Sequence, residues 1–183
     1  MISGMMNALI TFYKEYSVVG ILESLENTSI SLFIRESDSL WSFPAILTAH
    51  AFGYCFIMAT NSIVSARMLG FAKTIPFKPL KKLFPVMWIG LIVTIFTGLA
   101  LTMAAAQKRV PNPILWFKMA LLLVAAPMMW FFQKKVFDDP SVTENNVPPS
   151  ARTMAAWQLA LWILIMISGR LIPYSGTILG DGY

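Results

Sequence analysis

Four long apolar segments constrain the fold of this chain more than any other feature. They lie at about residues 40–66, 84–106, 113–132 and 154–174, and each has at least the roughly 20 residues that an α-helix needs to cross a bilayer. Only 13% of the 183 residues are charged, against roughly 25% in a typical soluble domain. We therefore predict an all-α integral membrane protein, in which residues 40–174 form a four-helix transmembrane bundle surrounded by lipid bilayer.

The regions outside the predicted bundle are short. Residues 1–39 alternate apolar stretches with charges, and Asn27-Thr28-Ser29 is typical of a break or a helix cap. No stretch there is long enough to span a bilayer, so we expect an amphipathic N-terminal arm at the outer interface, or alternatively a partner-binding arm. No charged segment precedes a clean apolar run, so no cleavable signal peptide is expected. Residues 175–183 are glycine-rich and predict a short extended tail.

The basic residues gather in loops between the spans. The Arg67–Lys82 loop has five basic residues and no acid, the Gln133–Thr153 loop has three basic residues, and the arm has two against five acids. The positive-inside rule then places both loops in the cytoplasm. It predicts a multi-pass membrane protein with the N- and C-termini on the outer side, which in a bacterial inner membrane would be the periplasmic side. This distribution explains the net charge of +5 without a nucleic-acid partner.

Three ionisable side chains interrupt the predicted spans: His50, Lys118 and Arg170. His50 lies roughly 15 Å from the outer end of the first span, Lys118 lies roughly 8 Å deep in the third, and Arg170 lies about four residues before the outer end of the fourth. Ionisable residues within a membrane are costly and commonly functional. The simpler explanations are that Lys118 extends its amine to the headgroups and that Arg170 anchors the interface beside Tyr174.

His50, the single histidine of the chain, has two interpretations. One hydroxyl on a neighbouring helix, such as that of Thr94 or Thr97, would satisfy a neutral imidazole and make it a packing residue. Alternatively, its Nε2 atom is an axial ligand of haem b, and His50 is then the metal-binding residue of the protein. Ligation by two histidines would need a second chain.

The haem interpretation involves further residues. Gly53, one turn after His50, would leave room for the edge of the macrocycle. Lys118 would be a second ligand or a propionate partner, and Arg170 a propionate partner. Aromatic side chains would form the walls of the pocket: Phe43, Phe52, Trp116 and Phe117.

Small residues lie near one face of the second span at helical spacing. They let a neighbouring helix approach closely, or alternatively a flat ligand. They are Gly90, Thr94, Thr97 and Gly98.

Copper is the other metal that the sequence suggests. The chain has twelve methionines, and soft ligands suit Cu(I). Met58 lies two turns from His50, but no methionine cluster surrounds it, and packing is the alternative role for these side chains. The single cysteine, Cys55, excludes an intramolecular disulfide and a thiolate zinc site within one chain, and we expect it to be a small core residue. The spans contain no carboxylate pair, and the chain has no G-x-S-x-G and no P-loop motif.

Much of the chain, from about Ser29 to Tyr174, resembles a bacterial four-helix membrane family known as a domain of unknown function. The resemblance is carried by LWSFPAILTAHAFGYCFIMATNSIVSARMLGF, LFPVMWIGLIVTIFTGLAL, NPILWFKMALLLVA and LWILIMISGRLIPY. More distantly, the pattern resembles HemJ-type protoporphyrinogen oxidases and CopD-type copper-resistance membrane proteins. The HemJ resemblance implies haem b, with His50 and Lys118 as the functional pair and Arg67 at the family's arginine position. The 40-residue arm departs from that pattern, and protoporphyrinogen oxidation is not carried over.

Three functions follow as hypotheses. The first is a haem b protein of electron transfer or redox chemistry, exchanging electrons with quinone or an exported redox partner. The second is a non-catalytic accessory subunit of a larger membrane complex, in which the chain contacts a membrane-protein partner or forms a homo-oligomer. The third is copper handling. The sequence does not distinguish an enzyme from a non-catalytic protein.

Overall fold

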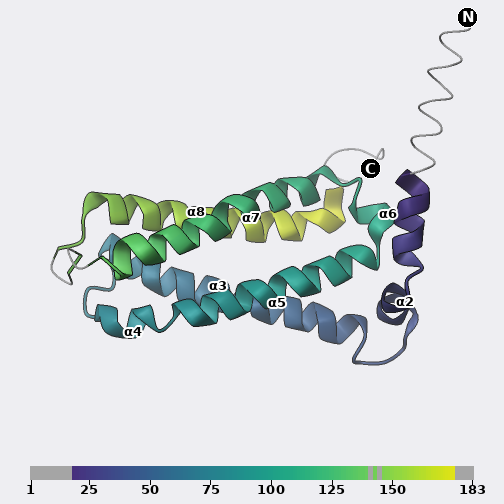
Figure 1. The fold of residues 1–183 in the computed structure, drawn as a ribbon, viewed down its shortest axis with the longest axis horizontal. Helices are drawn as coiled ribbons and strands as arrows, with labels where there is room; N and C mark the ends of the chain where they lie inside the picture. Colours follow the sequence, from purple (N-terminus) through teal and green to yellow (C-terminus); the bar gives the residue numbers. More distant parts are fainter. Residues whose placement is uncertain (1–17, 140–141, 144–145, 176–183) are drawn as a thin grey trace, which may run out of the picture.

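The computed structural model describes residues 18–139, 142–143 and 146–175. Within these residues, four long helices form a bundle: α3 (Phe43–Leu69), α5 (Phe84–Met103), α7 (Pro113–Phe132) and α8 (Pro149–Leu171). The part of the chain that the structure describes contains no strand. Figure 1 shows the four helices lying along one axis, with successive helices running in opposite directions. The predicted all-α four-helix bundle is confirmed.

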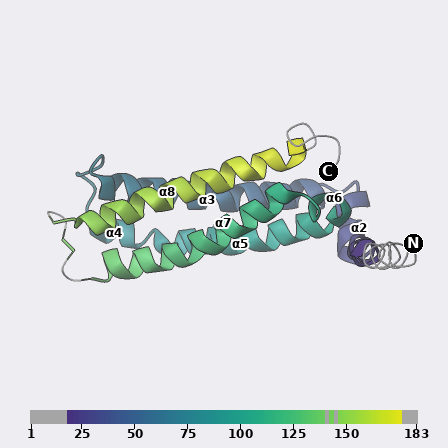
Figure 2. The ribbon, with the colours of Figure 1, turned by 90° about the horizontal axis from the view of Figure 1, so that it is seen from above.

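The bundle is built from two helical hairpins. Helix α3 packs against α5, α7 packs against α8, and α3 also packs against α8, an arrangement visible in Figures 1 and 2. The large buried side chains at the centre come from all four helices and include Ile57, Phe84, Phe132 and Trp162. The ring centroids of Phe84 and Phe132 lie 6.4 Å apart, which joins α5 to α7.

The outer surface of the bundle is apolar. In the most hydrophobic part of each span, only 11–28% of the residues are buried within the protein, and large side chains such as Phe52, Ile89, Phe96 and Leu123 point outward. An apolar surface of this extent is unfavourable in water and requires lipid around it. The helices are also long enough to cross a membrane, so the chain is a multi-pass membrane protein.

Helix α3 extends beyond the predicted end of the first span at residue 66. Arg67 does not stop the helix because its side chain is buried: Nε donates to the carbonyl of Ile75 at 2.6 Å, and the guanidinium lies 4.7 Å from the centre of the Phe77 ring. The helix instead ends at Gly70, whose φ of 93° is a left-handed conformation that glycine adopts at little cost.

Two other boundaries differ from the prediction. The fourth span starts at Pro149 rather than near residue 154, because proline in the first turn of a helix sacrifices no hydrogen bond. The second span ends at Met103, three residues early, and a separate short helix α6 (Ala106–Arg109) follows it. Three further short helices flank the spans: α4 (Phe77–Lys81), the π-helix η1 (Gln133–Phe137) after α7, and the 3₁₀-helix η2 (Ile172–Tyr174) after α8.

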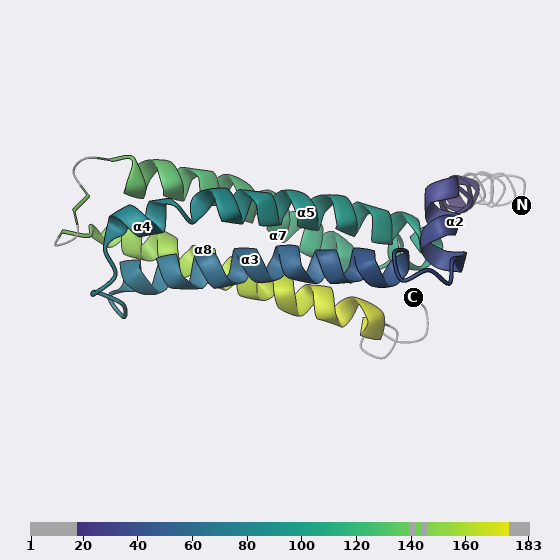
Figure 3. The same ribbon diagram turned by 90° about the horizontal axis from the view of Figure 1, so that it is seen from below.

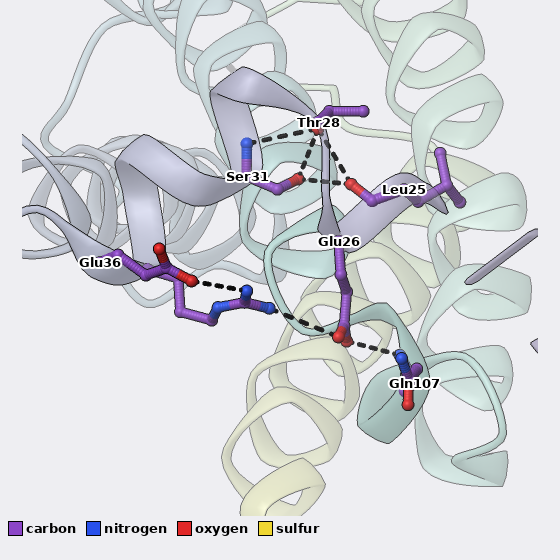
Figure 4. Close-up of polar contacts among 7 residues, drawn as sticks. Leu25, Glu26, Thr28, Ser31, Glu36 and Gln107 are labelled. Atoms are coloured by element: carbon purple, nitrogen blue, oxygen red, sulfur yellow. Dashed lines mark hydrogen bonds and ion pairs between the residues drawn. The ribbon is translucent and has the colours of Figure 1, made fainter. Parts of the chain in front are cut away.

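The described part of the N-terminal arm contains two helical segments, residues 18–26 and α2 (Ser29–Glu36). They lie across one end of the bundle (Figure 3), the end that also carries α6 (Figure 1). The predicted cap is present, since the Thr28 hydroxyl accepts from the backbone N–H of Ser31 at 3.3 Å. In Figure 4, the Glu26 carboxylate reaches the backbone N–H of Gln107, at 2.8 Å. The prediction for residues 1–17 and most of the predicted tail lie outside the described residues.

Candidate functional site

His50 lies on α3 and faces α5, near the end of the bundle that carries α6. Its Nδ1 atom is 2.9 Å from the hydroxyl oxygen of Thr97. The Thr97 hydroxyl donates its own proton to the carbonyl of Val93 at 2.6 Å, so its oxygen is left to accept from His50. This pattern favours the tautomer with the proton on Nδ1 and a free electron pair on Nε2. The expected hydroxyl partner on the second span is therefore present.

The small residues of α5 make close contact with α3. A Cβ atom on Gly90 would lie 2.6 Å from the carbonyl oxygen of Gly53, and one on Gly53 would lie 2.7 Å from the Thr94 hydroxyl. A Cβ on Gly98 would lie 3.1 Å from Cε1 of His50. The packing explanation for this stripe is thus confirmed. The assignment of Gly53 to a cofactor is wrong, because α5 fills the space that the missing side chain leaves.

Lys118 of α7 extends its side chain over Gly169 of α8. A Cβ on Gly169 would lie 3.3 Å from the Lys118 Nζ atom, so the glycine provides the room that the amine occupies. The side chain is only partly exposed. Lys118 also lies within electrostatic reach of His50. Two of the three residues selected from the sequence, His50 and Lys118, are therefore brought together.

Arg109 is a third member of this group, and the sequence analysis did not select it. It ends α6, beyond the membrane-spanning helices, and its Nη1 donates to the carbonyl of Leu101. It lies within electrostatic reach of both His50 and Lys118. Burial lowers the pKa of its guanidinium, but the ordinary value of that pKa is so high that the group stays charged at neutral pH.

The His50–Lys118–Arg109 cluster has no acidic counterpart among the described residues. The spans themselves contain neither aspartate nor glutamate. Glu26, which binds the backbone N–H of Gln107 near Arg109, pairs instead with Arg35 at 3.4 Å. Two cations beside an imidazole, in partly buried positions, are stabilised by an anion or by a strongly polar ligand. The cluster therefore has the electrostatic character of an anion-binding site.

Arg170 does not join the cluster. It is exposed on α8, and no hydrogen bond or ion pair is found for it within the described part of the chain. The predicted aromatic walls are also wrong for a single chain, because these side chains point outward from the bundle. Their exposed fractions are 41% for Phe43, 60% for Phe52, 59% for Trp116 and 54% for Phe117.

Metal-binding groups other than His50 are sparse in this region. In the described ranges, no three His, Cys, Asp or Glu side chains come together as a metal site. Cys55 is exposed on the outer face of α3, so the expectation of a core position is wrong. Its small side chain lies where the helix meets lipid. Met58 is partly buried and packs against the central hydrophobic core.

Comparison of the chain with protein-family models, with curated proteins and with solved structures found no match in any of the three.

Proposed function

We propose that this chain is a haem b-binding membrane protein that transfers electrons, and that His50 Nε2 would bind the haem iron. The observation that carries the proposal is the pair of cations near His50, Lys118 and Arg109, which no acid of the described spans neutralises. The hydrogen bond between His50 Nδ1 and Thr97 Oγ1, 2.9 Å long, fits a packing histidine equally well and is also what a metal-binding histidine needs. Histidine ligands typically donate their second ring N–H to a neighbouring oxygen, which fixes the ring and leaves the other nitrogen free for the metal. When bound, haem b supplies a one-electron iron couple.

The charges around His50 support an anionic cofactor. Lys118 and Arg109 would each bind a propionate carboxylate of the haem. From the sequence, Lys118 and Arg170 were the expected propionate partners. Charge-assisted hydrogen bonds from such groups are short and about twice as strong as neutral ones. Since no acid within the described spans neutralises these cations, a carboxylate ligand would satisfy both the charge and the hydrogen-bond donors.

The molecules that exchange electrons with the haem form part of the same proposal. By the positive-inside rule, the end of the bundle that carries α6 faces the periplasm of a bacterial inner membrane. A site near that surface would be accessible to a membrane quinol or to an exported redox protein.

The proposal is tested by absorption spectra of the purified protein loaded with haem, first oxidised and then reduced with dithionite. We expect a Soret band and a reducible α-band, both lost in His50→Ala. Lys118→Met should lower the affinity for haem roughly tenfold. Lys118→Arg should retain most of that affinity, and Lys82→Met, at the opposite end of the bundle, should leave it unchanged.

Two outcomes would contradict the haem proposal. One is a featureless spectrum from wild-type protein that is monodisperse and folded by circular dichroism. The other is a Soret band that survives in His50→Ala. Copper found by elemental analysis, without porphyrin, would favour copper handling instead, and absence of any cofactor would favour the accessory-subunit hypothesis.

A further inference from the structure

Unpaired polar atoms are concentrated in the interior of the bundle. Among the described residues, seven buried side-chain nitrogen and oxygen atoms have no hydrogen-bond partner within the protein. Both amide atoms of Asn61 and of Gln158 are among them, and these two residues are 0% exposed. The others belong to Ser65, Thr94 and Trp162. All seven lie within the membrane-spanning helices; Thr94 lies beside His50, and the other six are not in contact with the His50–Lys118–Arg109 cluster.

Most of these atoms belong to the interface between α3 and α8. Asn61 and Ser65 are four residues apart and share one face of α3, as Gln158 and Trp162 do on α8. The register of the two antiparallel helices is set by Tyr54, whose hydroxyl donates to the carbonyl of Trp162. The rings of Tyr54 and Trp162 are also in contact, with centroids 6.4 Å apart.

This register brings the two amides close in depth. Measured along the helix axes from the Tyr54–Trp162 contact, Gln158 lies about 6 Å away and Asn61 about 10 Å away, both towards the end that carries α4. Their backbone positions thus differ by less than one helical turn. Ser65 lies one turn beyond Asn61 on the same face. The interface therefore carries a continuous polar strip, which we call the α3–α8 seam (Tyr54, Gln158, Asn61, Ser65 and Trp162).

The polar atoms of the seam need partners. A buried polar group without a hydrogen bond costs about 1–3 kcal/mol, and lipid on the outside of the bundle offers none. A direct bond between the Asn61 and Gln158 amides would use one donor and one acceptor, whereas each amide has two donors and an oxygen with two lone pairs. Trp162 Nε1 and the Ser65 hydroxyl would still be unpaired.

The mixture of donors and acceptors identifies the missing partner. A bound cation would suit the amide and hydroxyl oxygens but not Trp162 Nε1, which can only donate. Water both donates and accepts, and buried waters typically bind two to four such groups. We propose that the α3–α8 seam is a hydrated site, in which ordered water is hydrogen-bonded to Asn61, Gln158 and Trp162. This site is independent of haem binding at His50.

The test is X-ray hydroxyl-radical footprinting of the full-length protein in lipid nanodiscs, because radicals form from water and label the side chains that touch it. Trp162 and Met129 are both 0% exposed and both belong to the hydrophobic core, but of the two only Trp162 carries an unpaired polar atom. We expect Trp162 to be oxidised roughly tenfold faster than Met129 if water is bound beside it. Indole and thioether groups are both easily oxidised, so a dry seam would leave Trp162 labelled no faster than Met129.

A variant establishes that the water depends on the seam. Gln158→Met keeps a similar volume and removes both amide atoms, and it should slow oxidation of Trp162 while leaving Met129 unchanged. Asn61→Leu serves the same purpose if Gln158→Met does not fold. Oxidation of Trp162 no faster than that of Met129 in the folded wild type would overturn the proposal. Oxidation of Trp162 unchanged in a folded variant would overturn it as well.

Discussion

The orientation of the His50 ring depends on one hydroxyl group. Thr97 accepts from Nδ1, and Gly98 leaves the room in which the ring lies. Both are on α5, so the ring belongs to the α3–α5 hairpin, whereas Lys118 comes from the other hairpin. An imidazole held in this way has a defined tautomer without any carboxylate beside it. Whatever binds at Nε2 therefore meets a neutral donor atom, with the positive charge supplied by neighbours.

We predict that Thr97→Val destabilises the protein by about 1 kcal/mol, the typical value for one side-chain hydrogen bond between membrane helices. Valine keeps the shape of threonine but cannot accept from His50. Thr97→Ser, which keeps the hydroxyl, should lose less than half as much. The measurement is reversible unfolding in mixed micelles. Equal losses in the two variants would show that packing, rather than the hydrogen bond, is what threonine provides.

His50 and Lys118 could be predicted as site residues from the sequence, because ionisable residues are rare within apolar segments. Arg109 was missed because it stands in a basic turn, where arginine is ordinary, and only the fold brings it near His50. Gly53 was misassigned because a glycine looks the same in sequence whether a ligand or a helix fills its space. The outward positions of Cys55 and Phe52 were equally hidden, since lipid-facing and buried positions are both apolar.

Helices α3 and α5 approach each other closely at two glycines. Gly53 and Gly90 face each other there, with too little space for even one Cβ atom. Small residues at such crossings allow van der Waals contact along both helices, which is the main attraction between helices in lipid.

We predict that Gly53→Ala lowers the free energy of unfolding by about 1–3 kcal/mol, because the helices must separate to admit the methyl group. The matched control is Gly20→Ala in the helical segment of the arm, where a Cβ meets nothing within 4 Å. That change should be neutral or slightly stabilising, since alanine is the better helix former. Thermal unfolding monitored by circular dichroism measures both. A neutral Gly53→Ala would mean that the two helices have more freedom than the structure shows.

The number and rough position of the spanning helices followed from hydropathy, but their ends did not. Helix α3 continues past Arg67 because a carbonyl and an aromatic ring far along the loop receive the guanidinium, a tertiary effect with no local signal. The π-helix η1 was also unforeseen. By contrast, the start of α2 was predictable, because the Thr28 cap depends on residues within one turn.

For the molecule as a whole, the four spans place α2, α6 and η2 at one end and α4 and η1 at the other (Figure 1). The basic residues near the second end predict that it lies in the cytoplasm. Lys82 and Lys108 are both exposed, at opposite ends, and so provide a matched pair for testing the orientation.

In a Cys55→Ser background, we predict that Lys108→Cys reacts with a membrane-impermeant maleimide in intact spheroplasts. Lys82→Cys should react only after the membrane is made permeable. The readout is a gel shift of the labelled protein. The reverse pattern would invert the topology and place the His50–Lys118–Arg109 cluster near the cytoplasm.

The crossing of α3 and α5 at Gly53 also determines how disturbances travel along the molecule. Leu69, at the far end of α3, is about 24 Å from this point, whereas His50 is only about 4.5 Å from it. If α3 pivots at this crossing, a displacement at its α4 end reaches the imidazole reduced about fivefold, because the two distances differ by that ratio. Changes in bilayer thickness or in the loops would then leave the position of the His50 imidazole almost undisturbed. Because His50 lies so close to the crossing, motion at the far end of α3 would move its side chain very little.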